Sequence, residues 1–300
     1  MAGEKLMAPY SVPSRTAFLV LGSLMFNRWT EHGFLIKVLD LKGWNGHKPG
    51  MRRNKTDRVW APGIFTEPGQ SDARLITIEC RVFMPTEQAL REATNRLAAV
   101  LQDGGTERLT VDHPVFGVQY TDVQLASDTD GHWSVPGIYP FQLHLIAPDP
   151  KKYGQSATGS TEVPVDGGGL YYDLGTSAIA PGVLDYGLPG NPGTVTMANA
   201  GTASTSPVFT VTGQMPRGFT ITETQSGRRL IFTTAVIAGQ VLRLDSGDGT
   251  VTLDGDADRT SDLIRAEWTQ LRPESSSTWL FEAPDSTNAK LTVEVTPAWW

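Results

Sequence analysis

The chain is poor in the residues from which metal and disulfide sites are built. Cys80 is the only cysteine among 300 residues, which excludes an intrachain disulfide and a zinc site made of cysteines. It lies in the alternating run 75–83, where we expect it to be a small buried side chain. The five histidines are scattered, and none forms the His-Glu-x-x-His pattern of a zinc helix. We therefore expect no metal site and no cofactor.

Long apolar runs and catalytic motifs are also missing. No run reaches the 18 or so apolar residues of a membrane span, and residues 18–26 are too short and lack a signal-type cleavage pattern, so we predict no membrane insertion. There is no nucleophile elbow, no P-loop and no dinucleotide fingerprint, and Gly167–Gly169 precedes no helix. The acidic run 254–258 lacks the glycine and glutamate of a calcium loop. We predict that the protein is not an enzyme.

The sequence is rich in turn-forming residues, and its charged residues are unevenly distributed between the two halves. The 31 glycines and 20 prolines predict a protein made mainly of β-strands, and 300 residues suffice for two domains. Residues 1–155 hold 17 basic and 16 acidic side chains, whereas residues 156–300 hold 8 and 16. The acidic second half argues against nucleic acid as its ligand.

The first half predicts a sheet with one helix. Residues 16–25 and 33–41 are expected to form an opening hairpin, and residues 74–83 a strand. Pro85 and a Thr86 cap begin an amphipathic helix over 86–102, which Gly104 ends. Further strands are predicted at 108–111, 116–125 and 140–146, and Pro148 and Pro150 end the last of them. We interpret residues 1–155 as a β-sandwich domain with one helix.

A basic segment with tryptophans at or beside its ends covers residues 42–58. Two interpretations stay open: a contact with a polyanion, or a long solvated or interface loop, of which we favour the second because the charges follow no periodicity. The candidate contact residues for a neighbouring subunit are Lys48, Arg52, Arg53, Lys55 and Arg58.

The second half changes character twice. Residues 156–194 are rich in glycine and proline and are predicted to be a crossing between domains. From 195 to 300, eight or nine short strands follow one another without a helix, which predicts a galectin-like or jelly-roll sandwich.

Three stretches together resemble the distal tail protein family of long-tailed siphovirus bacteriophages, also known as minor tail proteins or siphovirus-type tail components. They are the strand Arg-Leu-Ile-Thr-Ile-Glu from Arg74, the stretch Leu-Ile-Ala-Pro-Asp-Pro-Lys-Lys-Tyr-Gly over 145–154, and a carboxy-terminal succession. That succession runs from Asn199-Ala-Gly through Ser206-Pro-Val-Phe and Gly239-Gln-Val-Leu to Glu267-Trp-Thr-Gln-Leu-Arg-Pro and Lys290-Leu-Thr-Val. Only Glu274-Ser-Ser-Ser departs from the family, which usually has Pro-Gly-Asn there.

The resemblance implies a structural protein of the virion at the tail tip, assembled in the host cytoplasm. It implies a homohexameric hub ring whose one face docks on the tail tube protein and whose other face holds a tail-associated tip protein or tape measure protein. Peripheral receptor-binding proteins are further implied partners, and the genome passes through the lumen without specific binding. The basic residues of 42–58 would then face a subunit or the tube.

An alternative function is a carbohydrate-binding, lectin-like module that contacts the host cell surface. Its candidate glycan-stacking residues are Trp268 and Trp279, because aromatic rings stack on sugar rings, although we favour core or edge packing for both. An enzyme acting on a wall polymer is a third and less favoured hypothesis.

Overall fold

The computed structural model describes residues 17–46, 49–127, 129–131, 137–168, 171–172, 184–185, 189–286 and 288–300. The chain divides into two compact units, residues 1–154 with Trp300, and residues 155–299. We call them unit 1 and unit 2 and describe each separately. No helix in the described residues is both long enough and apolar enough to cross a membrane.

Unit 1 is a sheet that curls until its strands meet again. Its strands are β1 (Phe18–Leu21), β2 (Leu24–Phe26), β3 (Leu35–Lys42), β8 (Arg74–Phe83), β9 (Glu107–His113), β10 (Gly117–Leu125), β11 (Asp130–Gly131), β12 (Ile138–Ala147) and β13 (Lys152–Tyr153). Within the unit the order is β11-β12-β8-β3-β2-β1-β9-β10-β13, and β10 also pairs with β12 at Gln124 and Leu125. The sheet therefore encloses its own core.

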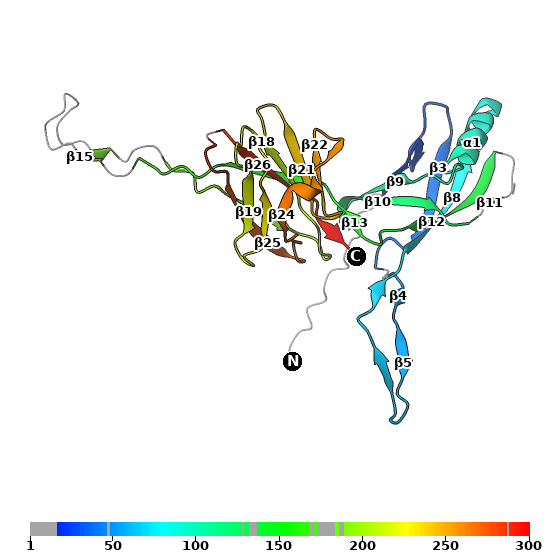
Figure 1. Cartoon of the computed structure of the whole chain (residues 1–300). Helices are drawn as coiled ribbons and strands as arrows, with labels where there is room; N and C mark the ends of the chain where they lie inside the picture. Colours follow the sequence, from blue (N-terminus) through cyan, green and yellow to red (C-terminus); the bar gives the residue numbers. More distant parts are fainter. Residues whose placement is uncertain are drawn as a thin grey trace, which may run out of the picture. The chain divides into compact units, whose positions relative to one another are not determined.

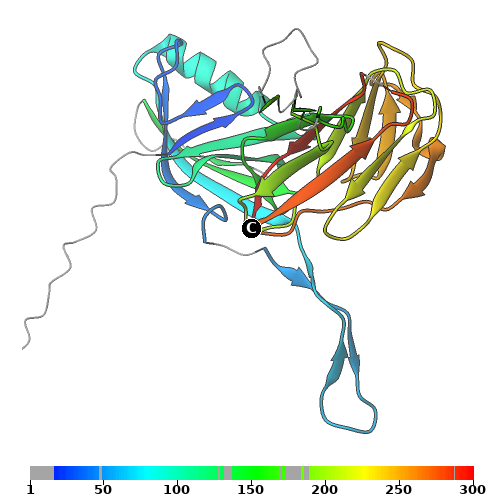
Figure 2. The same cartoon turned by 90° about the vertical axis from the view of Figure 1, so that its left-hand side faces the viewer.

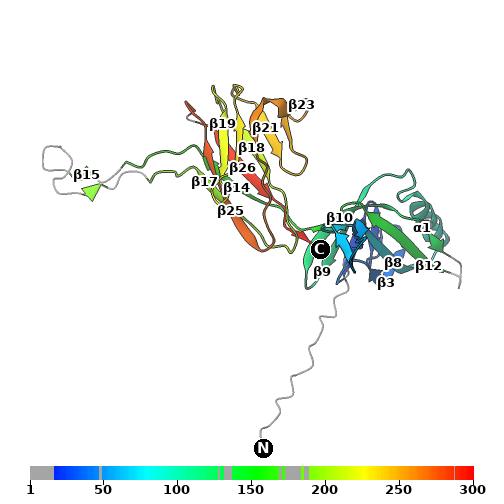
Figure 3. The ribbon, with the colours of Figure 1, turned by 60° about the horizontal axis from the view of Figure 1, so that its bottom comes forward.

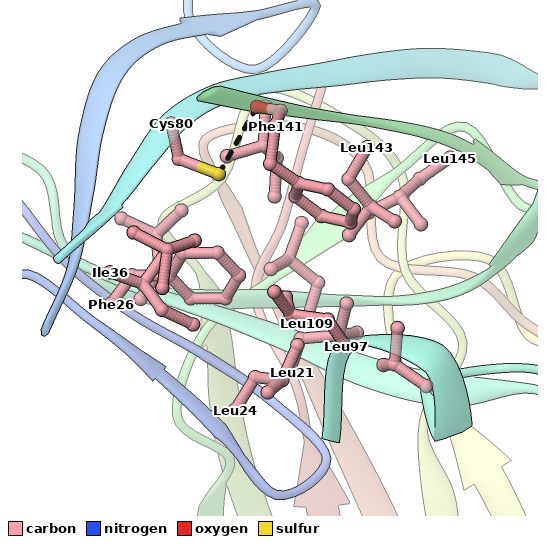
Figure 4. Close-up of a cluster of buried hydrophobic side chains, with 14 of the residues drawn as sticks. Leu21, Leu24, Phe26, Ile36, Cys80, Leu97, Leu109, Phe141, Leu143 and Leu145 are labelled. Atoms are coloured by element: carbon pink, nitrogen blue, oxygen red, sulfur yellow. Dashed lines mark hydrogen bonds between the residues drawn. The ribbon is translucent and has the colours of Figure 1, made fainter. Parts of the chain in front are cut away.

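That core follows the two-residue period of the strands. In β8 the residues Ile76, Ile78, Cys80 and Val82 are buried and alternate with more exposed neighbours, and β8 pairs with β12 over its whole length. Figure 4 shows Cys80 of β8 and Phe141 of β12 in a core that also holds Phe26 of β2, Ile36 of β3, Leu109 of β9 and Leu97 of α1. The Cys80 thiol donates to the carbonyl of Phe141 at 3.3 Å, and burial raises its pKa to about 12. Cys80 is thus the small buried residue that was predicted.

The α-helix of the described residues, α1 (Glu87–Ala99), covers this core (Figure 1). Thr86 caps it, with its hydroxyl accepting from the Ala89 amide at 3.1 Å. Small buried residues, Ala89 and Ala93, allow the helix to approach the sheet closely, and Leu97 completes the face. The predicted end at Gln102 is wrong: the helix stops at Ala99, and Leu101 takes a left-handed φ of 54° that turns its side chain into the core.

The predicted opening hairpin is also wrong. Gly22, with φ of 52°, reverses the chain inside the expected first strand, so β1 and β2 form the hairpin and β1 also pairs with β9. A side chain at Gly22 would lie 2.0 Å from the Glu107 carboxylate. β2 and β3 meet in parallel at one residue pair, Phe26 and Ile36.

Between β3 and β8 the chain leaves the sheet and returns. It forms two short antiparallel ladders, β4 (Met51–Arg52) with β7 (Gln70–Ser71) and β5 (Lys55–Asp57) with β6 (Ile64–Thr66). We call residues 49–73 the arm. Figure 2 shows it as a narrow blue hairpin leading away from the curled sheet.

Unit 2 is a sandwich of two antiparallel sheets (Figure 3). One has the order β14-β26-β18-β21-β22-β23 and the other β17-β25-β19-β20-β24. The strands are β14 (Ala157–Glu162), β17 (Thr194–Asn199), β18 (Val208–Thr212), β19 (Phe219–Glu223), β20 (Arg229–Phe232), β21 (Val241–Asp245), β22 (Thr250–Leu253), β23 (Ala257–Asp258), β24 (Leu263–Ala266), β25 (Ser275–Glu282) and β26 (Lys290–Val295). Smaller elements are β15 (Tyr171–Tyr172), β16 (Leu184–Asp185), the 3-10 turn η1 (Thr260–Asp262) and β27 (Ala298–Trp299).

The inner faces of the two sheets form the second core. Phe209 of one sheet meets Trp279 of the other edge-on, with ring centroids 5.6 Å apart, and Phe219 stacks on Phe232 at 5.3 Å. β14 was expected to belong to the crossing, but residues 157–162 pair with β26 at the edge of a sheet. The described part of the crossing therefore begins after Glu162.

Candidate functional site: the arm of unit 1 and the surfaces around it

The arm is anchored by buried side chains at its base. Trp44 precedes the arm and is buried, and its carbonyl accepts from the Lys152 ammonium at 3.0 Å. Arg74, which follows the arm, is also buried and donates to the carbonyls of Gly43 and Pro150, both at 2.8 Å. Two of the stretches that carry the family resemblance thus meet here and hold both ends of the arm.

Burial of two cations near each other has an electrostatic cost. Burial, and next the charge of Arg74, lower the pKa of Lys152 from 10.5 to about 8. The ammonium also lies 5.8 Å from the centre of the Trp44 ring, where the ring electrons attract it. The cations are retained because the carbonyls at the base of the arm need donors inside the protein.

Beyond its base the arm has no core. Every residue from 51 to 65 is exposed, and Trp60 near the tip is 97% exposed. Val59, Ile64 and Phe65 also present large apolar surface to solvent. Because a two-stranded hairpin is only marginally stable in water, and apolar surface gathered at a tip is unusual in a monomer, the arm has the features of a segment that docks on another protein.

The predicted basic residues are distributed along this arm. Arg52 pairs with Asp72 at 3.5 Å, Arg53 reaches the sulfur of Met51, and Arg58 lies 4.8 Å from the centre of the Phe65 ring. Lys55 is exposed on β5, and Lys48 lies outside the described residues. The expected loop is therefore a hairpin, in which the basic residues at 52–58 precede the apolar residues at 59–65 instead of forming one continuous basic face.

The sequence interpretation missed the apolar tip. The turn signal Ala61-Pro-Gly63, set between runs that include Val59, Trp60, Ile64 and Phe65, was available but lay just past the basic segment. The base of the arm was missed as well, because the partners of Arg74 and Lys152 are distant in sequence.

The two predicted glycan-stacking tryptophans differ sharply. Trp279 is 1% exposed in the core of unit 2, so it cannot stack on a sugar, and that assignment is wrong. Trp268 is half-buried and borders a cavity. In the described residues no three or more His, Cys, Asp or Glu side chains gather to hold a metal. The Asp254 carboxylate accepts from the Val241 amide at the start of β21, and the Asp258 carboxylate accepts from the Thr260 amide.

A family model decides the relationship of unit 2. Residues 200–299 match the siphovirus-type tail component, C-terminal domain. This third of the chain is therefore similar to that domain. The match confirms the resemblance to siphovirus distal tail proteins drawn from the sequence. No curated protein matches this chain by sequence.

Solved structures extend the likeness to both units. The crystal structure of SPP1 Dit (gp 19.1), described as a paradigm of the hub adsorption apparatus in phages that infect Gram-positive bacteria, matches with a TM-score of 0.66 and 14% identity over 95% of this chain and 100% of that chain. A chain in the phage P2 baseplate in its activated conformation with Ca matches with a TM-score of 0.50 and 9% identity, over 93% of this chain and 98% of that one. At these identities the likeness establishes that this chain shares their fold.

Proposed function

We propose that this chain is a non-catalytic hub protein of a siphovirus tail, and that six copies form a ring at the distal end of the tail tube. The observation that carries the proposal is the family match of residues 200–299, joined to the likeness of nearly the whole chain to SPP1 Dit. In the ring, unit 1 makes the contacts between copies. One face of the ring meets the tail tube and the other meets the tip proteins, and the genome passes through the lumen.

The surface of unit 1 supports this role. Among the described residues, large hydrophobic side chains that are exposed number 12 in residues 17–154 and 4 in residues 155–299. The first group is Met25, Trp29, Leu39, Met51, Val59, Trp60, Ile64, Phe65, Leu75, Val115, Phe116 and Val118. Interfaces that persist bury apolar surface of this kind, whereas a free monomer gains nothing from exposing it.

The arm is the part of unit 1 that we assign to a neighbouring copy. Its apolar tip would bury Trp60 and Phe65 on that neighbour, and Arg52, Arg53, Lys55 and Arg58 would lie beside the buried patch as its polar rim. The mixture of apolar and basic side chains fits a protein surface better than a polyanion, which needs a continuous basic face.

The test compares the particle mass of the full chain with that of an arm variant, Val59→Ser, Trp60→Ser and Phe65→Ser. We expect the native chain to form a closed ring and the variant to stay monomeric and folded, because these side chains contribute nothing to either core. The matched control is Ile237→Ser with Ile264→Ser, two exposed apolar residues of unit 2, which should leave the ring intact.

Two other outcomes count against parts of the proposal. If the arm variant still forms rings but the rings no longer bind purified tail tube, the arm contacts the tube and not a neighbouring copy. Normal rings and normal tails from Arg52→Glu with Arg53→Glu would remove the two arginines from the contact.

A further inference from the structure

Unit 2 contains a cavity that the hub function does not use. Its volume is about 790 Å³, and it opens where the β19–β20 turn, the end of β21 and the start of β25 come together. Glu223, Gln225, Arg228, Ser246 and Arg272 contribute polar groups to its lining, and Trp268 contributes an indole. This volume is in the range of small-molecule sites.

The polar groups of the wall are held in fixed positions. The buried carboxylate of Glu223 accepts from the hydroxyls of Ser277, at 2.8 Å, and Ser226. The Gln225 side chain accepts from the Thr278 amide at 3.0 Å, and Arg228 donates to the Trp268 carbonyl at 3.0 Å. A ligand would therefore meet a wall that is already ordered, which lowers the entropy cost of binding.

Trp268 supplies an apolar platform in this polar wall. Part of its side chain packs against the core of unit 2, and it also lines the cavity. Gly249, with φ of 70°, lets the backbone come close to the indole, because a side chain there would lie 3.3 Å from Nε1. An indole held in this way can stack on the apolar face of a sugar ring, whose hydroxyls point outward to polar partners.

Ser246 is a second sign that something polar belongs in the cavity. It is 6% exposed, and its Oγ has no hydrogen-bond partner in the described residues. Buried hydroxyls are almost always paired. The Oγ is buried beside the cavity, so it would meet a group bound there after a change of the Ser246 rotamer.

The charge of the lining selects among polar ligands. Arg228 and Arg272 are its basic residues and Glu223 is its only acid, although residues 156–300 as a whole hold 16 acidic and 8 basic side chains. Two hydroxyls orient the Glu223 carboxylate, which can still accept from a ligand hydroxyl, and two guanidiniums against one carboxylate leave the lining with an excess of positive charge. Guanidinium groups bind carboxylates in a planar, two-point geometry.

We propose that this cavity binds an acidic saccharide, with a sugar ring stacked on Trp268 and its carboxylate directed to Arg228 and Arg272. The hydroxyls of the sugar would pair with Glu223, Gln225 and Ser246. This site does not depend on ring formation: a monomer should bind as a ring does, so failure of the hub proposal and failure of this one are separable.

The test is a titration of the full chain, followed by intrinsic fluorescence and calorimetry, with four defined probes: an oligogalacturonate, a hyaluronan hexasaccharide, maltohexaose and AMP. We expect at least one of the two acidic oligosaccharides to bind about tenfold more tightly than maltohexaose, because only they present carboxylates to the arginines. Trp268→Ala should weaken that binding by about tenfold or more, and Trp60→Ala, which removes an exposed indole from the arm, should not change it.

A second pair of variants guards against loss of folding. Arg272→Met changes an exposed side chain and should lower affinity for the acidic probe about fivefold or more while changing maltohexaose affinity less than about twofold. Arg217→Met, an exposed arginine paired with Asp285 outside the cavity, is the control. No acidic oligosaccharide binding at about 10 mM, equal affinity for maltohexaose, tighter binding of AMP, or indifference to both Trp268→Ala and Arg272→Met would each overturn the proposal.

Discussion

One tryptophan of unit 1 and one of unit 2 lie in opposite environments, although Trp44 at the base of the arm is buried. Near the tip of the arm in unit 1, Trp60 is almost wholly exposed, whereas Trp279 of unit 2 is fully buried between two sheets. Among the described residues, 12 large apolar side chains are exposed in residues 17–154 and 4 in residues 155–299. Unit 1 exposes apolar surface that another protein could cover. Unit 2 buries most of its large apolar residues and has a cavity with a mainly polar lining. The difference points to assembly by unit 1 and ligand contact by unit 2.

Replacing each of these two tryptophans with alanine should give the largest difference between the units in the free energy of unfolding. Trp279→Ala is expected to lower the free energy of unfolding by about 3–5 kcal/mol, because it empties a space between Phe209 and the facing sheet. Trp60→Ala should change it by less than about 0.5 kcal/mol, since the side chain touches little within the chain. Denaturant unfolding of both variants measures the two effects. Equal destabilisation would remove the distinction on which the comparison rests.

Substitution of the buried arginine at the base of the arm should give the next largest loss of stability. Arg74→Met leaves the carbonyls of Gly43 and Pro150 buried without these donors and should cost about 2–4 kcal/mol. Arg108→Met is the matched control, because Arg108 makes an exposed pair with Asp122 and should contribute at most about 1 kcal/mol. A smaller loss for Arg74 than for Arg108 would show that the base of the arm does not depend on its buried cation.

The titration of Lys152 tests the same base through pH. Its pKa is about 8 in the fold and 10.5 in an unfolded chain, so between these values the unfolded chain holds more protons. The free energy of unfolding should therefore rise with pH in the native chain relative to Lys152→Met, by up to about 3 kcal/mol from pH 7 to pH 10.5. Unfolding curves of the pair across this range measure the difference. A difference that stays constant with pH would contradict the lowered pKa.

The smallest expected effect concerns the helix of unit 1. Thr86→Ala removes the hydroxyl that accepts from the Ala89 amide and should lower the free energy of unfolding by about 1 kcal/mol. Thr86→Ser keeps a hydroxyl at this position and should retain most of the stability. Thr94→Ala, at an exposed position inside the same helix, should be neutral or slightly stabilising because alanine favours helix. The same substitution thus has opposite expected signs at two positions, which thermal unfolding can resolve.

Most of unit 2 could be predicted from its sequence because its strands are short, alternate regularly and are separated by clear turns. Strands were expected and found at 208–213, 241–245 and 290–297, each within about two residues at its ends. Trp279 was the failure, because a tryptophan in a strand gives no local sign of which face it occupies until the pairing of the sheet is known.

Unit 1 was harder because its arrangement depends on distant contacts. The turn at Gly22 looks like the interior of an apolar strand, and only the pairing of β1 with β9 explains why the chain reverses there. In the arm, the charges at 52–58 are evident in the sequence. The hairpin depends on the pairing of residues 55–57 with 64–66, and the apolar tip lies around the turn between them. The cavity beside Trp268 joins segments more than 60 residues apart, from Ser204 to Ser277, so no local pattern could have predicted it.

The central claim, that the chain assembles through unit 1 into a hub ring, is tested most directly by sedimentation of the purified full chain together with negative-stain imaging. The account predicts a particle of six times the 32.5 kDa chain mass, with sixfold symmetry and an open lumen, that dissociates when Val59, Trp60 and Phe65 are changed to serine. A native chain that stays monomeric at about 100 µM, with no ring in assembled tails, would contradict it.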